Sequence, residues 1–344
     1  GEEWKTISPD LSAHDPEKTG AVGSGAENYA VVYSLAESPL AKGLLWAGTD
    51  DGKVWVTEDE GANWTDLTSF LPAAVKGQWV SRLEAGQHDA KVAYLAVDAH
   101  RTGNLAPLAY RTADKGRTWQ SIAGNLPANG PVKVIREDPK NPHLLYAGTE
   151  LGAFVSVDLG RQWTKLDLPT VAVDALLVHP RDNDLVIATH GRSLYILDDV
   201  APLQALTAEV LAKDAYLFAP RAAVGFHPFP GWADWAGNSG IFRGDNPPVG
   251  AALTYYVRDY AGETVKIAVK DQKGRPVANL KGPDGPGLHR VVWDLKPTKD
   301  VLTEYGGEGS RFMPPGEYKL TLTRGKATSE QTVKVELLPG VETR

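Results

Sequence analysis

Four acidic residues stand at corresponding corners of a repeated pattern and could act on a glycosidic bond. Asp50, Asp51, Asp98 and Glu150 each follow an apolar run that predicts the second strand of a repeated unit. Glycoside hydrolysis uses two carboxyl groups about 5–10 Å apart, one protonated and one ionised. These four residues are therefore candidate catalytic groups. The alternative interpretation for Asp50, Asp51 and Glu150 is a hairpin turn, because Asp51-Gly52 is a typical turn sequence and Glu150 stands at the equivalent corner.

A second group of residues could bind a ligand. Asp98, His100 and Arg101 open a loop that the other units lack, and His190 and Arg192 occupy the matching corner of the last unit. Charge-assisted hydrogen bonds from such side chains can hold a sugar or a carboxylate. The alternative is an Arg–Asp pair that only holds the long loop in place.

The elements that position these residues come from an internal repeat. The pattern [ST]-x-D-x-G-x-x-W occurs at residues 57–64, 112–119 and 156–163, and its tryptophans are separated by 55 and 44 residues. A four-stranded propeller blade needs roughly 40–50 residues. Each unit also divides into four short β-rich runs separated by Pro, Gly and Asp. The sequence therefore predicts all-β propeller blades.

The repeated motif itself is expected to be structural. Its Asp can accept backbone N–H groups across a turn, its Gly permits a positive φ, and its Trp can pack between blades. The residues assigned this role are Asp59, Gly61, Trp64, Asp114, Gly116, Trp119, Asp158, Gly160 and Trp163.

The two ends of the repeat region are incomplete. The last unit runs into Ala201-Pro202 without a further motif, and the sequence GEEW at residues 1–4 matches only the tail of one. In one interpretation the N-terminal run completes the last blade and closes a four-bladed ring. In the other, which we favour, residues 1–204 are about four blades at the end of a larger propeller, and Gly1 is not the native start.

The motif resembles the Asp-box, or BNR, repeat of sialidases, xyloglucan-cleaving glycoside hydrolases and sortilin-type receptors. Residues 45–52, 98–101, 145–152 and 190–192 look like the C-terminal part of large secreted bacterial proteins labelled BNR-repeat glycosyl hydrolase or sortilin-like. The resemblance implies a β-propeller and a secreted, cell-surface or periplasmic location. The arginine triad and Tyr–Glu pair of sialidases cannot be assigned here, so the resemblance does not extend to sialidase activity.

The C-terminal third predicts a separate module. We expect a linker over residues 205–249 and a β-sandwich over residues 250–344, with Trp293 in its core. Residues 288–294 and 314–318 resemble the Ig-like domain of flagellar hook-capping proteins and of secretion-associated bacterial modules. Such modules space or bind other parts, and exposed edge strands would permit self-assembly or association with another chain.

Composition excludes several classes of function. The 344 residues carry a formal charge of −7 without a Lys/Arg run, which argues against a nucleic-acid partner. No apolar stretch is long enough to predict a membrane span. The chain has no cysteine, so thiol catalysis and thiolate metal sites are absent. We expect neither a metal nor a cofactor.

Two functions remain open from the sequence. The favoured one is non-catalytic binding of a carbohydrate or protein ligand, or a structural role at the cell surface. The alternative is a glycoside hydrolase acting on a polysaccharide, with part of its active site on blades outside this sequence. Fold resemblance alone does not transfer activity, so whether the protein is an enzyme is left undecided.

Overall fold

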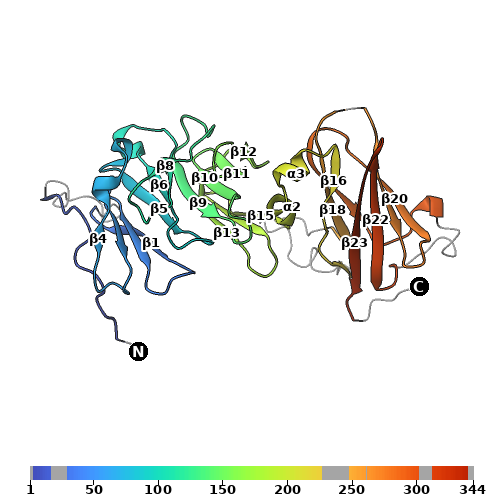
Figure 1. The fold of residues 1–344 in the computed structure, drawn as a ribbon, viewed down its shortest axis with the longest axis horizontal. Helices are drawn as coiled ribbons and strands as arrows, with labels where there is room; N and C mark the ends of the chain where they lie inside the picture. Colours follow the sequence, from blue (N-terminus) through green and yellow to red (C-terminus); the bar gives the residue numbers. More distant parts are fainter. Residues whose placement is uncertain (1–2, 17–28, 227–247, 261, 302–311, 340–344) are drawn as a thin grey trace, which may run out of the picture. The chain divides into compact units, whose positions relative to one another are not determined.

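A computed structural model describes residues 3–16, 29–226, 248–260, 262–301 and 312–339. The chain divides into two compact units, Gly1–Gln204 and Ala205–Arg344. Both units are built almost entirely of antiparallel strands (Figure 1). The prediction of an all-β chain with four-stranded repeated sheets is confirmed.

The first unit contains four sheets that follow one another along the chain (Figure 1). Three have four strands in sequence order, as expected for propeller blades, and the last has three. Their bounds are β1 (Val32–Glu37), β2 (Leu45–Thr49), β3 (Val54–Thr57) and β4 (Thr65–Asp66); β5 (Trp79–Ala85), β6 (Ala93–Asp98), β7 (Leu108–Thr112) and β8 (Gln120–Ser121); β9 (Val132–Glu137), β10 (Leu145–Thr149), β11 (Gly152–Ser156) and β12 (Thr164–Lys165); and β13 (Val173–Val178), β14 (Leu185–Thr189) and β15 (Leu194–Leu197).

Each of the four sheets has the same irregularity in its first strand. The register between first and second strands shifts immediately after the first paired residue of β1, β9 and β13, and after Val80 of β5. The residues left unpaired are Tyr33, Ser81, Lys133 and Asp174. A bulge of this kind bends the strand and redirects a side chain, and bulges are frequent beside functional sites.

Successive sheets pack face to face through apolar side chains. Trp46 of β2 contacts a cluster that includes Leu83 of β5, Tyr94 of β6 packs with Ile135 of β9, and Tyr146 of β10 packs in the cluster of Leu176. This packing needs small residues at some positions: a Cβ on Gly148 would lie 2.6 Å from the carbonyl oxygen of Val173. The apolar faces that recur in each sheet therefore determine how one sheet packs on the next.

The three motif turns share one hydrogen-bond pattern. The Asp carboxylate accepts the hydroxyl two residues before it and the backbone N–H four residues after it, at 2.7–2.9 Å. The Gly N–H in turn donates to the same hydroxyl. In the second copy these bonds lower the pKa of Asp114 to about 2, the hydrogen bond from Thr118 being the largest cause. The Trp indoles differ, since Trp163 is buried whereas Trp64 and Trp119 are half-buried.

The second unit has one core between two sheets, of order β16-β18-β21 and β17-β23-β22-β19-β20. Trp293 lies fully buried in it and contacts Tyr318 edge-on. The strands are β16 (Ala215–Leu217), β17 (Ala223–Gly225), β18 (Ala251–Val257), β19 (Val265–Lys270), β20 (Pro276–Gly282), β21 (Gly287–Trp293), β22 (Gly316–Arg324) and β23 (Ala327–Leu337).

The region expected to link the two parts contains regular structure. Short helices α2 (Ala201–Gln204) and α3 (Ala208–Leu211) follow the last sheet of the first unit. β16 then pairs with β18, and β17 pairs with β23, so part of residues 205–249 belongs to the sheets of the second unit. Periodicity did not reveal these two strands because each has only three residues.

Candidate functional site

The predicted acidic residues lie at one repeated corner of the sheets. Asp50, Asp98, Glu150 and His190 stand at the end of the second strand of each sheet, beside the bulge of the neighbouring first strand. In antiparallel sheets of this order, the motif turns after the third strands lie at the opposite edge. The structure thus gathers the candidate site residues on one edge and the motif residues on the other.

Asp98 joins the second sheet to the third. Its carboxylate is fully buried and accepts hydrogen bonds from the backbone N–H of His100 at 3.0 Å and from Lys133 Nζ at 2.6 Å; His100 Nδ1 lies 2.7 Å away. Burial acts to raise the pKa of Asp98, but the hydrogen bonds from Lys133 and His100 outweigh it and hold the pKa below its usual value. Lys133 also contacts Glu150 at 3.2 Å. The ionised carboxylate of Asp98 therefore connects Lys133 of the third sheet to the loop of His100 in the second sheet.

Asp50 and Asp51 are both buried, and their carboxylates contact different parts of the chain. Asp50 accepts the N–H of Val31 at 2.9 Å and pairs with Arg101 from the second sheet at 3.2 Å. Asp51 accepts the N–H of Ala13 at 2.7 Å and the hydroxyl of Thr49. Both carboxylates thus hold parts of the chain together in this structure.

Trp79 is the centre of the contacts on this edge. Its Cα is the register partner of Asp98, Tyr33 meets its ring edge-on at 4.7 Å, and Arg101 lies 4.5 Å over it. The ring of His100 is 5.9 Å away. The indole is only half-buried, yet its Nε1 is buried and has no hydrogen-bond partner among the described residues. We call Tyr33, Trp79, Asp98, His100, Arg101, Lys133 and Glu150 the Trp79 cluster.

The matching corner of the last sheet is more open. His190 Nδ1 lies 3.1 Å from the carboxylate of Asp174, the bulge residue of β13. The backbone N–H of Arg192 donates to Thr189, and its side chain is exposed. These contacts stay within the last sheet, whereas the Trp79 cluster draws on the first three sheets. The two predicted ligand-binding groups therefore remain separate.

The two carboxylates of the cluster share one lysine, and Asp98 is not suited to proton donation. Asp98 and Glu150 contact the same ammonium group, at 2.6 and 3.2 Å from Lys133 Nζ. A glycosidase also needs one carboxyl group that stays protonated, whereas the hydrogen bonds from Lys133 and His100 hold the pKa of Asp98 below its usual value. The arrangement is suited to binding and orienting a polar ligand.

Glu84 is an ionisable group that the sequence analysis did not single out. It lies on β5, is buried and ion-paired to Arg136 of β9, and burial raises its pKa to about 7. A hollow of about 240 Å³ lies beside it, lined in part by Glu37, Arg82 and Gln87. Glu84 is the register partner of Tyr94 at the far end of β5 from Trp79, so it is not part of the Trp79 cluster.

The raised pKa of Glu84 predicts a pH dependence of stability. A carboxyl whose pKa is higher in the folded state stabilises the fold fully below its unfolded pKa of about 4.3, and this contribution is lost as pH rises through 7. We expect wild-type protein to lose on the order of 3 kcal/mol between pH 5 and pH 8 from this group, and Glu84→Gln to lack that loss. Urea unfolding at both pH values measures it. Glu58→Gln, at an exposed ion pair with Lys115, is the control; identical pH slopes for wild type and Glu84→Gln would contradict the prediction.

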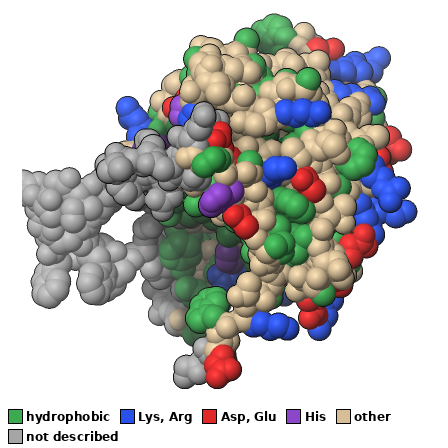
Figure 2. Space-filling model, turned by 90° about the vertical axis from the view of Figure 1, so that its left-hand side faces the viewer, with side chains coloured by type: hydrophobic (Ala, Val, Ile, Leu, Met, Phe, Trp, Pro, Cys, Tyr) green, Lys and Arg blue, Asp and Glu red, His purple; other side chains and the backbone are tan. Residues whose placement is uncertain are grey.

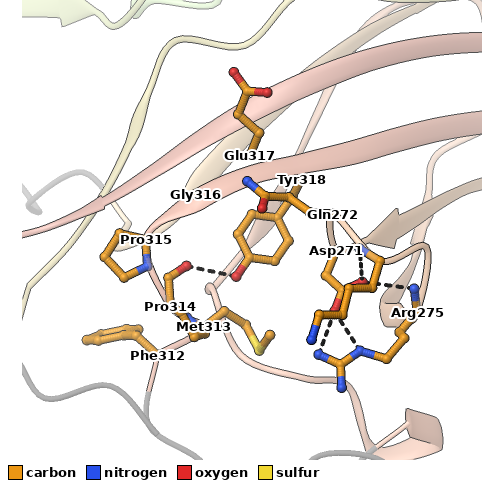
Figure 3. A pocket seen from close by; sticks show the side chains of 11 residues that line it. Asp271, Gln272, Arg275, Phe312, Met313, Pro314, Pro315, Gly316, Glu317 and Tyr318 are labelled. Atoms are coloured by element: carbon orange, nitrogen blue, oxygen red, sulfur yellow. Dashed lines mark hydrogen bonds and ion pairs between the residues drawn. The ribbon is translucent and has the colours of Figure 1, made fainter.

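A larger hollow of about 340 Å³ lies in the second unit (Figure 3). Phe312, Met313 and two prolines form its apolar side, the Tyr318 hydroxyl donates to the carbonyl of Pro314 at 2.8 Å, and Asp271 is paired with Arg275. The Asp271 carboxylate is thus already paired with a neighbour, and Lys273 and Glu317 complete the charged part of the lining. Among the described residues, no group of three or more His, Asp or Glu side chains could hold a metal ion, and no helix is long and apolar enough to cross a membrane.

Comparisons with curated proteins find partial similarity to two proteins named as xyloglucanases. It is 29% identical over 141 residues to a xyloglucanase of a Paenibacillus species and 28% identical over 109 residues to a probable oligoxyloglucan-reducing end-specific xyloglucanase of Neosartorya fischeri. The matches cover 36% and 31% of this chain but only 13% and 12% of those relatives. These names favour the glycoside-hydrolase alternative over a purely non-catalytic function. No family model matches the chain.

Solved structures with a similar arrangement include the GH74 enzyme of Niastella koreensis, with 13% identity and a TM-score of 0.40 over 88% of this chain and 47% of that one. PorZ, a surface component of the type-IX secretion system of Porphyromonas gingivalis, has 13% identity and a TM-score of 0.40 over 94% of this chain and 47% of PorZ. This chain therefore spans less than half the length of either protein.

Several cluster residues escaped the sequence analysis. Tyr33 and Lys133 are bulge residues, and Trp79 precedes the bulge of its own strand. A bulge leaves no clear mark on a period-two pattern, so these side chains could not be assigned to a face. The one signal in the sequence was a large aromatic at the first position of a strand, next to Gly77-Gln78.

Proposed function

We propose that the first unit binds a polysaccharide of the xyloglucan class on the edge formed by the Trp79 cluster. The observation that carries this is the half-buried Trp79 indole, next to the partly exposed side chains of His100 and Arg101. Sugar rings stack on aromatic faces, and their hydroxyls pair with charged donors and acceptors. The xyloglucanase names of the two relatives supply the substrate class.

Hydrolysis is the second candidate function. It is favoured by the same names and by the shared contact of Asp98 and Glu150 with Lys133. A ligand that displaced Lys133 would leave Glu150 free to act as a base or nucleophile. The hydrogen bonds from Lys133 and His100 keep Asp98 ionised, so in this proposal the proton donor comes from residues outside the cluster.

The proposal also covers the type of the repeated turns, the role of the second unit and the location of the protein. We infer that the repeated turns are Asp-box turns, that the second unit is an Ig-like module acting as a spacer, and that the protein works outside the cell or at its surface. The shared Ser/Thr-Asp-Gly hydrogen-bond pattern and the common core of the two sheets support the first two inferences. The third rests on the resemblance to secreted proteins.

Titration calorimetry with a xyloglucan oligosaccharide tests the binding proposal, and a reducing-end assay on xyloglucan run beside it tests hydrolysis. We expect saturable binding, and weaker binding of an unsubstituted cello-oligosaccharide. Release of reducing ends that disappears in Glu150→Gln would establish the hydrolytic function instead. Absence of both heat and reducing ends at millimolar oligosaccharide would contradict the proposed substrate class.

A further inference from the structure

The hollow beside Glu84 is lined by side chains from three successive sheets. Glu37 comes from β1, Arg82 and Glu84 from β5, and Arg136 from β9, with Gln87 in the turn after β5. These five side chains are charged or carry an amide. The volume of about 240 Å³ is several times the roughly 30 Å³ that one water molecule occupies. The hollow is therefore large enough for a small polar ligand.

Two opposite charges occupy the same register position in neighbouring sheets. Glu84 pairs with Tyr94 in the second sheet, and Arg136 pairs with Tyr146 in the third. Arg136 Nη1 donates to the Glu84 carboxylate, and its Nε donates to the carbonyl of Leu176 in β13 at 2.8 Å. The Arg136 guanidinium is thus fixed by two neighbours while its side chain stays 29% exposed. A guanidinium held in this way keeps further N–H donors in a fixed orientation.

Arg82 brings a second guanidinium to the same hollow. It lies two residues before Glu84 on β5, so both side chains lie on the same face of the sheet. Its Nε is buried and has no hydrogen-bond partner among the described residues. Burial and the charge of the nearby Arg136 lower the pKa of Arg82. Buried polar groups are nearly always hydrogen-bonded, and adjacent guanidinium groups are suited to an oxyanion.

The positive charge is local to this hollow. The whole chain carries a formal charge of −7, and Figure 2 shows Lys and Arg side chains interspersed with Asp and Glu over the face that it displays. Glu37 lines the hollow but is exposed, whereas Arg82 and Arg136 are half-buried. Solvent screens an exposed charge more than a half-buried one. An anion in the hollow is therefore attracted by the two arginines more strongly than it is repelled by Glu37.

We propose that this hollow binds a small oxyanion, such as a sulfate or carboxylate group, between the guanidinium groups of Arg82 and Arg136. The anion accepts hydrogen bonds from both arginines, including the buried Nε of Arg82, while Arg136 keeps its bond to the carbonyl of Leu176. The site lies at the far end of β5 from Trp79. It is therefore separate from the proposed sugar-binding edge and does not depend on that proposal.

Glu84 makes anion binding depend on pH. An ionised Glu84 repels the anion, whereas a protonated Glu84 leaves the positive charge of both arginines to the ligand. Burial raises the pKa of Glu84 to about 7, so its protonated fraction falls about tenfold between pH 6 and pH 8. The apparent dissociation constant varies inversely with the binding-competent fraction. We therefore expect about tenfold tighter binding at pH 6 than at pH 8.

Other ionisable groups near Glu84 must be separated from its effect. Those on the elements packed against it are Glu37 of β1, Arg82 of β5, Tyr94 of β6, Arg111 of β7, and Arg136 and Glu137 of β9. Glu137 accepts the Tyr94 hydroxyl at 2.9 Å and the N–H of Gln87 at 2.5 Å. His88 follows Gln87, and its Nε2 lies 2.8 Å from the carbonyl of Asp138. Because histidines titrate near neutral pH, a Glu84→Gln variant is needed to assign the pH dependence.

Titration calorimetry of the full chain with sodium sulfate and with glucuronate, at pH 6 and pH 8, tests the proposal. Both anions keep their charge over this range, so a change in affinity reports on the protein. We expect saturable binding at pH 6, and glucuronate binding without sulfate binding would assign the site to the carboxylate of an acidic sugar. Arg82→Met keeps the apolar stem and should weaken binding at least about tenfold, as expected for the loss of one charged hydrogen-bonding partner.

Two control variants make the test specific. Arg117→Met, at an exposed arginine in the motif turn of the second sheet, changes the net charge equally and should bind the anion like wild type. Glu84→Gln should bind equally at pH 6 and pH 8. The proposal is overturned by equal anion affinity in wild type and Arg82→Met, by absence of binding of both anions at tens of millimolar, or by a pH dependence that persists in Glu84→Gln.

Discussion

An Asp98→Ala variant is expected to unfold with a free energy about 3–5 kcal/mol lower than wild type, because it leaves a half-buried ammonium without its main partner. Lys133 is 18% exposed and lies 2.6 Å from the Asp98 carboxylate. Among the described residues, its remaining ion-pair partner after the substitution is Glu150, which is half-exposed. The backbone N–H of His100 also loses its acceptor.

Urea unfolding followed by tryptophan fluorescence measures this loss. Glu150→Gln removes the exposed partner of the same lysine and is the matched control, expected to cost less than about 1 kcal/mol. Combining Asp98→Ala with Lys133→Met should recover part of the loss, since no unpaired charge remains. Equal effects of Asp98→Ala and Glu150→Gln would show that the buried pair does not stabilise the junction between the second and third sheets.

The same carboxylate predicts the direction of acid sensitivity. The pKa of Asp98 is lowered in the folded state, so its stabilising contribution is present above the unfolded pKa of about 3.9 and declines as pH falls towards the folded value. This is opposite in sign to the effect of Glu84. The Asp98→Ala variant should accordingly lose less stability than wild type on acidification below about pH 4.

Trp79→Ala is expected to weaken xyloglucan binding at least about 30-fold, which corresponds to the roughly 2 kcal/mol typical of an aromatic that dominates an interface. The indole is the aromatic surface on which Tyr33, His100 and Arg101 converge. Its removal deletes the stacking face and also releases Arg101 from its position 4.5 Å above the ring.

Two further variants make the binding test specific. Trp79→Phe should keep most of the affinity, because Nε1 of Trp79 makes no hydrogen bond within the described residues and only the aromatic face is needed. Trp119→Ala removes a half-buried tryptophan at the opposite edge of the same sheet and should leave the dissociation constant unchanged. Calorimetry measures all three, and an unchanged affinity in Trp79→Ala would place the sugar site elsewhere.

The repeated architecture followed from local features of the sequence. The hydroxyl, Asp, Gly and Trp at fixed spacing specify a turn closed by its own side chains, and the turn sets the register of the strands around it. The second-strand ends could therefore be aligned between units, and this alignment was enough to place Asp50, Asp98 and Glu150 at one corner.

The side chains that pair with these carboxylates are set by contacts between sheets, which sequence spacing does not encode. Lys133 reaches Asp98 across 35 residues, and Arg101 reaches Asp50 across 51. Both partners come from a neighbouring sheet, so these ion pairs form only when the sheets are packed. The same is true of Glu84, whose pKa is raised by burial between β5 and its neighbours.

Local sequence features were sufficient to predict that the chain is all-β, that its N-terminal part is built from repeated four-stranded units, and which corner of each unit carries acidic residues. Hairpin turns and strand periodicity set these properties within one unit. The packing of one sheet on the next was needed to bring Trp79, Tyr33 and Lys133 to the acidic corner and to pair its charges. Bulge direction, burial and charge pairing arise where two sheets meet, and the free energy of each depends on that neighbour.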